Sequence, residues 1–441
     1  MMKRNFLSKL FQASLMCCLA VILTGCDELF DAIDNPIQTS ISMATSDVKL
    51  AVGQTNQRKA TTASPATIVY ASSDATVATV DANGVVTGVA AGTTTITASV
   101  AAVDGWTAAS ASYKVIVEGG PAPAPALTML QTPLTLEAAE AGAKVAFNIG
   151  VATGVEYSTD GENWSSYTSG TAITLAAIGD KVSFRGTNAA YSDGFAFSNI
   201  SCDKDCYIYG NIMSLIKANG FENETTLTAD YTFYGLFMYN AKIKNHTDAT
   251  KYLVLPATKM TAYCYYQMFY NCTGLTTTPV INVDCDAKEF CIAEMFRSCS
   301  GLTTVAEGSK ISGNMGSSSC SEMFSGCSKL ESVPSDLLPS ISLATYCYFE
   351  MFQNCAKLEK APKLPAETLK SYCYYSMFYG CTVLNEAWVK ADYSVANNEC
   401  TGMFYGCAAT GTIHSKTGSN WDTGKVAAGI STWTLNEDYN D

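Results

Sequence analysis

The chain has 441 residues, of which 15% are charged, and a formal net charge of −13 at pH 7. A chain this acidic is not held by nucleic acid or by heparin-like polymers, because those partners require clustered lysine and arginine. The low charge content and the 24 tyrosines are typical of an exported, β-rich protein, and the length suggests about three domains.

Residues 1–25 have the features of a signal peptide. Three basic residues precede an apolar run over residues 15–23, which is too short for an ordinary membrane span. The sequence Leu-Thr-Gly before Cys26 resembles a bacterial lipobox. This resemblance implies that Cys26 is lipidated, and several acyl chains hold a protein firmly on a bilayer. We therefore expect a lipid-anchored protein of the outer membrane, exposed at the cell surface.

Residues 26–40 are expected to form a flexible tether. The acidic residues directly after Cys26 resemble the surface-export signals of Bacteroides-like lipoproteins, and a solvated tether explains them equally well. The leader carries three basic residues and no acidic ones, so its removal leaves a net charge of −16.

Residues 41–118 form a separate unit of short predicted strands. Asn83-Gly84 between two β-branched runs predicts a hairpin, and alternate residues from Thr94 to Val100 share one face of the next strand. This spacing of strands and turns predicts a β-sandwich. The motifs Ser-Ser-Asp, Val-Ala-Thr-Val, Asn-Gly-Val-Val and Gly-Thr-Thr-Thr-Ile-Thr resemble, in this order, the bacterial Ig-like domain of group 2. The resemblance implies a spacer or an adhesin stalk.

A Gly/Pro/Ala linker over residues 119–126 precedes a second small β-domain, which we expect over residues 127–206. Asp160-Gly161 predicts a hairpin that brings Tyr157 near Trp164. Such a pair can stack on a sugar ring, although aromatic residues more often fill the core of a small sandwich. From Cys202 to Ile216 we expect a helix, as part of an N-terminal cap over residues 207–230.

A short motif occurs seven times between residues 231 and 407. Its phenylalanines recur at intervals of 26 to 32 residues, at Phe237, Phe269, Phe296, Phe324, Phe352, Phe378 and Phe404. This period predicts stacked units that cover each other's apolar faces. The spacing of Cys, Met-Phe, Cys and Leu places apolar residues on one side of a short helical turn, and the prolines that follow predict an extended segment.

These motifs resemble a known repeat family. The Met-Phe-x-x-Cys-x-x-Leu runs resemble BspA-type leucine-rich repeats, and the segment Leu364–Leu369 resembles the Leu-Pro-Ala repeats of surface lipoproteins from Bacteroides-like gut bacteria. The resemblance implies a multidomain, mainly β protein that ends in a solenoid of short strands and helical turns over residues 231–407, with a C-terminal cap over residues 408–441. The Leu-Pro-Ala segment is missing from residues 279–290 and 305–319, which are therefore expected to pair poorly.

Fifteen cysteines remain once the leader is removed and Cys26 takes lipid. Twelve of them flank the Met-Phe motifs in pairs, Cys202 and Cys206 form a further pair, and Cys285 is left over. Export permits disulfides, whereas buried thiols suit an inward-facing ladder of small apolar side chains, and both alternatives stay open. The spacing does not fit a zinc site, and no metal or cofactor is expected.

The sequence contains no familiar catalytic motif. Its two histidines, His246 and His414, lie near the two ends of the repeats, and no nucleophile elbow, phosphate loop or His-Glu-x-x-His motif is present. Glu294, Glu322 and Glu350 each precede a Met-Phe pair and should line up on one exposed face. Paired carboxylates can hydrolyse glycosides, but a repeated glutamate is more often a solvated stripe, so we expect no enzyme.

The leading hypothesis is an adhesion or protein-interaction module, with the Ig-like domain as stalk and the repeats as binding surface for a host matrix protein. The alternative is a glycan-binding lipoprotein of a polysaccharide-uptake system. Both hypotheses use one aromatic set, because aromatic residues are enriched where proteins bind, although packing between repeats should occupy about half of it. The candidate residues are Tyr265, Tyr266, Tyr270, Tyr348, Phe349, Tyr374, Tyr375, Tyr379 and Tyr405.

Overall fold

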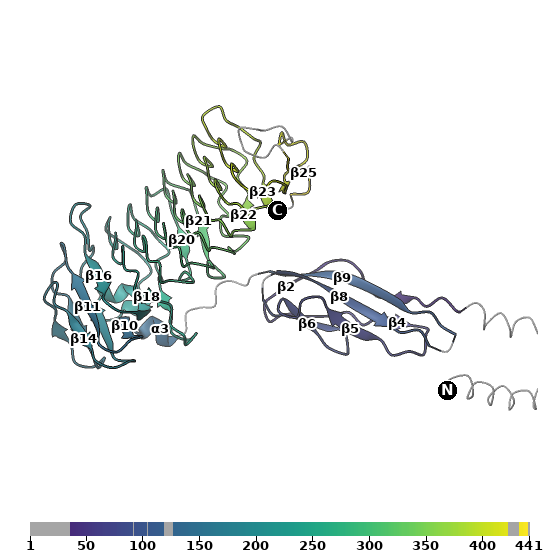
Figure 1. Ribbon diagram of the computed structural model, residues 1–441, viewed down its shortest axis with the longest axis horizontal. Coiled ribbons are helices and arrows are strands. Elements are labelled where there is room, and N and C mark those ends of the chain that lie inside the picture. The colour runs from purple at the N-terminus through teal and green to yellow at the C-terminus, as the bar shows by residue number, and fades with distance from the viewer. Residues whose placement is uncertain (1–35, 91, 104, 119–126, 422–431, 440–441) are drawn as a thin grey trace, which may run out of the picture. The chain divides into compact units, whose positions relative to one another are not determined.

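The computed structural model describes residues 36–90, 92–103, 105–118, 127–421 and 432–439 (Figure 1). The chain divides into two compact units, Met1–Gly120 and Pro121–Asp441. The signal peptide, Cys26 and the linker over residues 119–126 lie outside the described residues. Within those residues, no helix has the length and apolar character needed to cross a bilayer.

The first unit consists of three small sheets, in the orders β2-β9-β8-β5, β3-β7-β6 and β1-β4. Its strands are β1 (Ile41–Ser42), β2 (Val48–Ala51), β3 (Thr55–Gln57), β4 (Thr61–Thr62), β5 (Val69–Ser72), β6 (Ala78–Val80), β7 (Val85–Gly88), β8 (Gly92–Val100) and β9 (Ala109–Glu118). The expected hairpin joins β6 to β7, where Gly84 has a φ of 73°. From Thr94 to Val100, alternate residues of β8 are buried, as the period of two predicts.

Part of the expected tether belongs to this unit. The backbone N–H of Ile37 donates to the carbonyl of Gly105 (2.7 Å), and the N–H of Thr39 donates to the hydroxyl of Thr107 (2.9 Å). The boundary at residue 40 therefore lies too late, because these hydrogen bonds hold residues 37–39 against the first unit.

The second unit begins with two sheets and continues into the repeats. Its N-terminal elements are α3 (Leu127–Gln131), β10 (Leu134–Ala138), β11 (Ala143–Asn148), β12 (Glu156–Ser158), β13 (Ser165–Ser166), β14 (Ile173–Leu175), β15 (Lys181–Arg185), β16 (Asn199–Cys202), β17 (Cys206–Asn211) and the 3-10 helices η1 (Ile212–Leu215) and η2 (Phe221–Asn223). The larger sheet has the order β13-β12-β15-β10-β17-β18, with β19 also on β17, and the smaller has the order β14-β11-β16.

Strand β17 replaces the middle of the helix expected from Cys202 to Ile216, of which only the 3-10 turn η1 is helical. It pairs antiparallel with β10 on one side and in parallel with β18 (Ile243–Lys244) and β19 (Leu253–Val254) on the other, so pairing on both sides overrides local helix preference. Gly210 has a φ of 88°, and a Cβ there would lie 2.1 Å from the carbonyl oxygen of Pro133. The boundary expected at residues 206/207 is therefore wrong, because it separates the small β-region from its own central strand.

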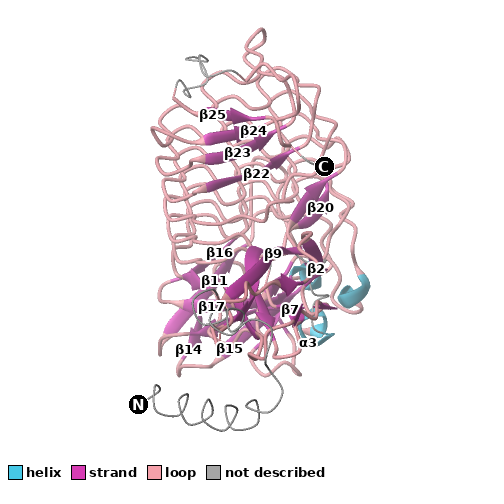
Figure 2. Cartoon of the chain, turned by 90° about the vertical axis from the view of Figure 1, so that its right-hand side faces the viewer, coloured by secondary structure: helices cyan, strands magenta, loops and turns pink. Residues whose placement is uncertain are grey.

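Short parallel strands occur at two places in the repeats, in separate sheets, and successive copies of the motif lie one above another (Figure 2). The strands are β20 (Asn282–Asp284), β21 (Lys310–Ser312), β22 (Lys360–Leu364), β23 (Glu386–Val389), β24 (Thr412–His414) and β25 (Thr434–Asn436). β20 pairs with β21, and β22 to β25 form a four-stranded sheet. The expectation that residues 279–290 and 305–319 pair poorly is thus wrong, because β20 and β21 in these segments pair in parallel, with Val283 and Ile311 buried.

Each Met-Phe run is a series of tight turns and not the helical turn that its spacing predicts. In the second copy, the N–H of Met268 donates to the carbonyl of Tyr265 (3.1 Å), whereas the N–H of Phe269 donates to Met295 of the next copy (2.9 Å). Gln267 and Asn271 have φ values of 53° and 56°, in the left-handed region that interrupts a helix. Along each run, backbone N–H groups therefore donate alternately to a carbonyl of the same turn and to a carbonyl of the next copy.

One continuous core runs through the second unit. The seven motif phenylalanines form a column whose neighbouring rings are 5.1 to 5.7 Å apart and nearly parallel. Trp433 and Trp421 pack on Phe404 at the end of this column, at 5.3 and 6.1 Å. The same core includes the buried residues of β10 and β17, so the small β-region closes the other end.

Candidate binding surface

The turns of the Met-Phe runs have a period of four residues, with two side chains inward and two outward. Three outward positions recur in every copy. They are the sixth residue before the motif phenylalanine, the third residue before it and the residue directly after it. We call the residues at these positions in the seven copies the outer face. Its aromatic members are Tyr231, Tyr234, Tyr263, Tyr266, Tyr270, Phe290, Tyr346, Phe349, Tyr372, Tyr375, Tyr379 and Tyr405.

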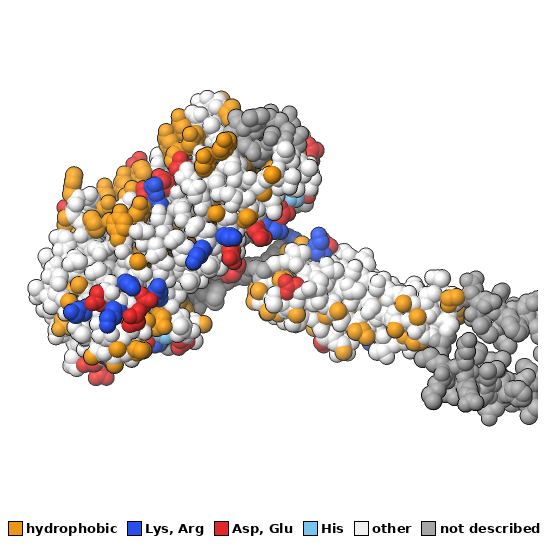
Figure 3. Space-filling view, viewed as in Figure 1, with side chains coloured by type: hydrophobic (Ala, Val, Ile, Leu, Met, Phe, Trp, Pro, Cys, Tyr) orange, Lys and Arg blue, Asp and Glu red, His pale blue; other side chains and the backbone are white. Residues whose placement is uncertain are grey.

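These outer aromatic rings stack between copies. Near the N-terminal end, Tyr231, Tyr263 and Phe290 follow one another at 4.8 and 4.9 Å. Near the C-terminal end, parallel pairs are formed by Tyr346 with Tyr372, Phe349 with Tyr375 and Tyr379 with Tyr405, at 4.6, 5.2 and 5.4 Å. Figure 3 shows orange hydrophobic patches along one edge of this unit, with acidic and basic side chains between them.

The structure separates the nine predicted surface residues into two groups. Tyr265, Tyr348 and Tyr374 are each only 1% exposed and pack in the core, so they cannot contact a partner. The other six lie on the outer face: Tyr266, Tyr270, Phe349 and Tyr375 are half-buried, and Tyr379 and Tyr405 are 39% and 57% exposed. The correction follows from the four-residue period, which turns the residue directly after each first cysteine inward.

The sequence interpretation missed half of the outer aromatic residues. The position six residues before the motif phenylalanine holds Tyr231, Tyr263, Phe290, Tyr346 and Tyr372. An alignment of the seven copies on their phenylalanines would have shown this aromatic column. The prediction instead relied on adjacent Tyr-Tyr pairs, in which the first tyrosine lies in the core.

The three repeated glutamates lie in successive copies and are not a freely solvated stripe. Arg297 donates to Glu294 (3.1 Å) and to Glu322 (2.6 Å), while Glu294 also accepts from the hydroxyl of Tyr266 (2.8 Å). The carboxylates of Glu294 and Glu322 are 13% and 19% exposed. The guanidinium of Arg297 is thus shared by two carboxylates of this row of glutamates.

Replacing Glu322 with glutamine is expected to stabilise the fold at pH 8 and to change little below pH 4.5. Burial, together with Glu294 and Glu350 and against the effect of Arg297, raises the pKa of Glu322 to about 7. Its stabilising contribution is therefore fully present below the ordinary carboxyl pKa of 4.5 and is lost as pH rises through 7. The gain at pH 8 should be roughly 1–3 kcal/mol, measured by thermal unfolding between pH 4 and 8. An equal shift of the melting temperature across this range would contradict the assignment.

All fifteen described cysteines are free thiols, and thirteen are buried. The second cysteine of each motif donates its S–H to the carbonyl of the phenylalanine one copy earlier, as Cys299 does to Phe269 (3.0 Å) and Cys327 to Phe296 (3.1 Å). Burial raises the pKa of Cys299 to about 12. Among the described residues, no group of three or more potential ligands can hold a metal ion.

In the small β-region, the aromatic rings of the possible sugar site are covered by other side chains. The guanidinium of Arg185 lies 4.1 Å over the ring of Trp164 and pairs with Glu156 (2.7 Å), while Tyr157 packs edge-on against Tyr167. A sugar would have to displace the guanidinium to reach Trp164, so this hairpin is a poor platform.

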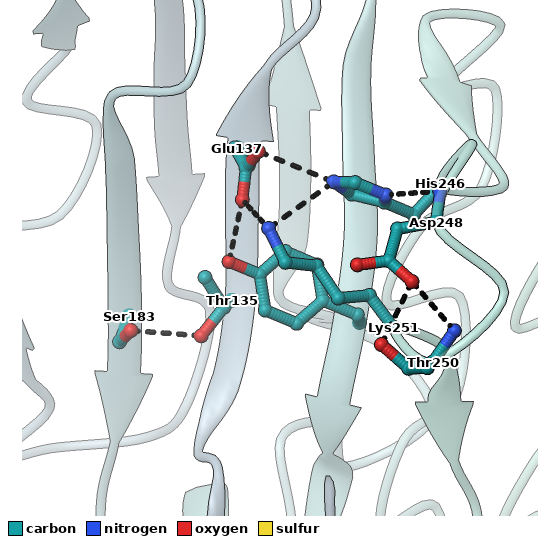
Figure 4. Close-up of polar contacts among 8 residues, drawn as sticks. Thr135, Glu137, Ser183, His246, Asp248, Thr250 and Lys251 are labelled. Carbon is teal, nitrogen blue, oxygen red and sulfur yellow. Dashed lines mark hydrogen bonds and ion pairs between the residues drawn. The ribbon is translucent and has the colours of Figure 1, made fainter.

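His246 belongs to a polar network at the junction with the repeats (Figure 4). Glu137 on β10 accepts from Tyr209 (2.7 Å) and Lys251 (2.8 Å), and its other oxygen lies 3.2 Å from Nε2 of His246. Nδ1 of His246 accepts from the backbone N–H of Asp248 (2.8 Å). Both ring nitrogens are therefore engaged, and the network joins β10 and β17 to the loop between β18 and β19. No sequence pattern pointed to Glu137, which lies 109 residues before His246 in the chain.

His414 is also engaged in contacts within the fold. Its ring stacks on Trp388 (4.8 Å), and Nδ1 lies 2.7 Å from Asp438. The two histidines thus make contacts within the fold at opposite ends of the repeats.

Comparison with known proteins identifies one segment. No curated protein matches the chain. Residues 37–110 match the family model described as the bacterial Ig-like domain (group 2), which covers the strands from β1 to the start of β9. This match, with the three small sheets of the first unit, supports the prediction of an Ig-like domain in this part of the chain.

Proposed function

We propose that the protein is an outer-membrane lipoprotein, anchored through Cys26, that binds a protein partner at the cell surface and has no catalytic role. In this proposal the Ig-like domain is the stalk. The copies over residues 231–407 are a solenoid of BspA-like leucine-rich repeats, and their outer face is the binding surface. The Ig-like match supports a surface or adhesion-type module, and the stacked, partly exposed aromatic rings are the observation that supports the binding surface.

The stacking favours a protein over a glycan as the partner. A sugar binds an aromatic residue by lying on the face of its ring, and in the stacked outer pairs one face of each ring is already covered by the ring of a neighbouring copy. The edges, hydroxyls and uncovered faces of these rings suit the mixed polar and apolar contacts of protein interfaces.

Replacing both Tyr379 and Tyr405 with alanine is expected to weaken binding to a host matrix protein by at least about tenfold, because exposed aromatic anchors dominate interface energies. Surface plasmon resonance with immobilised matrix proteins measures this affinity, and a glycan array tests sugar binding in parallel. Phe195→Ala is the control, since Phe195 is 97% exposed elsewhere in the same unit. Unchanged protein binding by the double variant would contradict the proposed surface, and glycan binding lost with these tyrosines would favour the polysaccharide-uptake alternative.

A further inference from the structure

The fourth copy interrupts the most aromatic of the outer columns. At the position six residues before the motif phenylalanine, the fourth copy has Ser318 where its neighbours have Phe290 and Tyr346. The fourth copy also has small Ser321 and Ser325 at the other two outer positions, and all three serines are buried, at 5 to 8% exposure. We call this interruption the serine break.

The backbone continues through the break without a change of register. The N–H of Phe290 donates to the carbonyl of Ser317 (3.3 Å), and the N–H of Ser318 donates to Thr345 (3.0 Å). Ser318 also has the left-handed φ, 53°, of the tyrosines at the equivalent position, such as 60° at Tyr346. Copies three and five are therefore held two regular steps apart, and only a ring is missing between them.

By the spacing of the column, one flat group would fit between Phe290 and Tyr346. Each step within the column separates ring centres by 4.6 to 4.9 Å, so two steps place Phe290 and Tyr346 about 9–10 Å apart. A planar group midway would lie about 5 Å from each ring, within the range of stacking and cation–π contacts. The faces that these two rings turn toward Ser318 are covered by no other ring among the described contacts.

The charge beside the break is negative. Glu322 and Glu350 stand four residues after Ser318 and Tyr346 on the same runs. Arg297 pairs with Glu294 and Glu322, and within the described residues Glu350 has no cation at ion-pair distance. Burial raises the pKa of Glu350 against the opposing effects of Arg297 and of a hydrogen bond from the Gln353 side chain, so a cationic group brought to this carboxylate would further favour its charged form.

Elsewhere this chain binds its own arginines in the same way. Arg185 lies 4.1 Å over Trp164 and pairs with Glu156, and Arg58 lies 4.5 Å over Tyr113. A guanidinium suits such places because it is planar, weakly hydrated and stacks on aromatic faces, whereas the ammonium of lysine is compact and strongly hydrated.

From these observations we infer that the serine break binds an arginine side chain of the protein partner, with the guanidinium between Phe290 and Tyr346 and hydrogen-bonded to Glu350. The inference rests on the proposed function and adds the chemistry of the partner: an exposed segment with arginine, drawn to a chain of strongly negative net charge.

Ser318→Tyr tests this inference, because it supplies the missing ring and fills the break. The variant should fold, since four other copies hold tyrosine at this position with φ values of 56° to 60°. Asn398→Tyr is the matched control: it adds a tyrosine to the same column in the last copy and leaves the break open. Glu350→Gln is a second variant that removes the carboxylate without adding bulk.

The probe is the peptide acetyl-Gly-Ser-Arg-Ser-Gly-amide, titrated into the purified full chain in detergent by calorimetry. Its affinity should fall at least tenfold with Ser318→Tyr and severalfold with Glu350→Gln, and stay unchanged with Asn398→Tyr. A peptide with citrulline in place of arginine should bind at least tenfold more weakly. Equal binding of the arginine peptide to Ser318→Tyr, or equal binding of the citrulline peptide, would overturn the inference.

Two further outcomes separate this inference from the proposed function. If a matrix protein binds Ser318→Tyr as well as the natural chain but fails to bind the Tyr379/Tyr405 double variant, the proposed function stands and the arginine site is overturned. If a neutral oligosaccharide binds the natural chain and Ser318→Tyr abolishes that binding, the break holds a sugar and the arginine site is overturned as well.

Discussion

Replacing Phe324 with alanine is expected to lower the free energy of unfolding of the second unit by about 3–5 kcal/mol, the usual loss for a large aromatic core residue. Phe324 is fully buried in the middle of the phenylalanine column, 5.7 Å from Phe296 and 5.4 Å from Phe352. The substitution removes both ring contacts and leaves a cavity that the hydrogen bonds between copies prevent from closing. Denaturant unfolding followed by tryptophan fluorescence measures the loss.

The control is Phe195→Ala, which makes the same chemical change at a residue that is 97% exposed and should alter stability by less than about 0.5 kcal/mol. Because each copy contacts only its neighbours, a cavity in the fourth copy also separates the array into two halves. A second unfolding transition in Phe324→Ala would show this separation. A loss below 1 kcal/mol would mean that the column does not hold the copies together.

Replacing Glu137 with alanine is expected to cost about 2–4 kcal/mol, because the change leaves Tyr209 and Lys251 at the junction without their shared acceptor. The hydrogen bonds from Lys251, Tyr209 and His246 outweigh the opposing effect of burial and lower the pKa of Glu137. The stabilisation is therefore present above the ordinary carboxyl pKa of 4.5 and is lost as pH falls through the lowered value.

Thermal unfolding of the natural chain and the Glu137→Ala variant from pH 3 to pH 8 measures this dependence. The difference between them should be largest near neutral pH and should shrink in acid. Glu140→Ala is the control, because Glu140 is exposed three residues farther along the chain. A difference that does not vary with pH would show that packing of the side chain, and not its charge, stabilises the junction.

Periodicity in the sequence predicted the stacked copies but not their backbone. Cys264, Met268 and Cys272 are spaced by four, which fits an apolar helical face as well as it fits the observed turns. The two differ at Gln267 and Asn271, which adopt left-handed φ values that these residues seldom choose alone. Hydrogen bonds to the neighbouring copy impose that conformation, and a single copy read in isolation contains no sign of it.

The candidate surface was predictable only in part for the same reason. The adjacent tyrosines 265 and 266 look equivalent in the sequence, yet one lies in the core and the other on the outer face. Once the four-residue period is known, Arg297 also stands out as the one charged residue of its column, and Ser318 as the interruption between Phe290 and Tyr346. The Glu137 network was not predictable, because it joins residues more than 100 positions apart through the pairing of β17.

The cysteine thiols that donate to carbonyls one copy earlier give the molecule a built-in set of chemical reporters. Cys299, Cys327 and Cys355 are completely buried in successive copies, so an alkylating reagent can reach each sulfur only when that copy opens. The labelling rates, resolved by peptide mass spectrometry, would therefore show whether the array frays from its termini or opens as a whole. Since none of these sulfurs is cross-linked, reducing agents should leave the order of labelling unchanged.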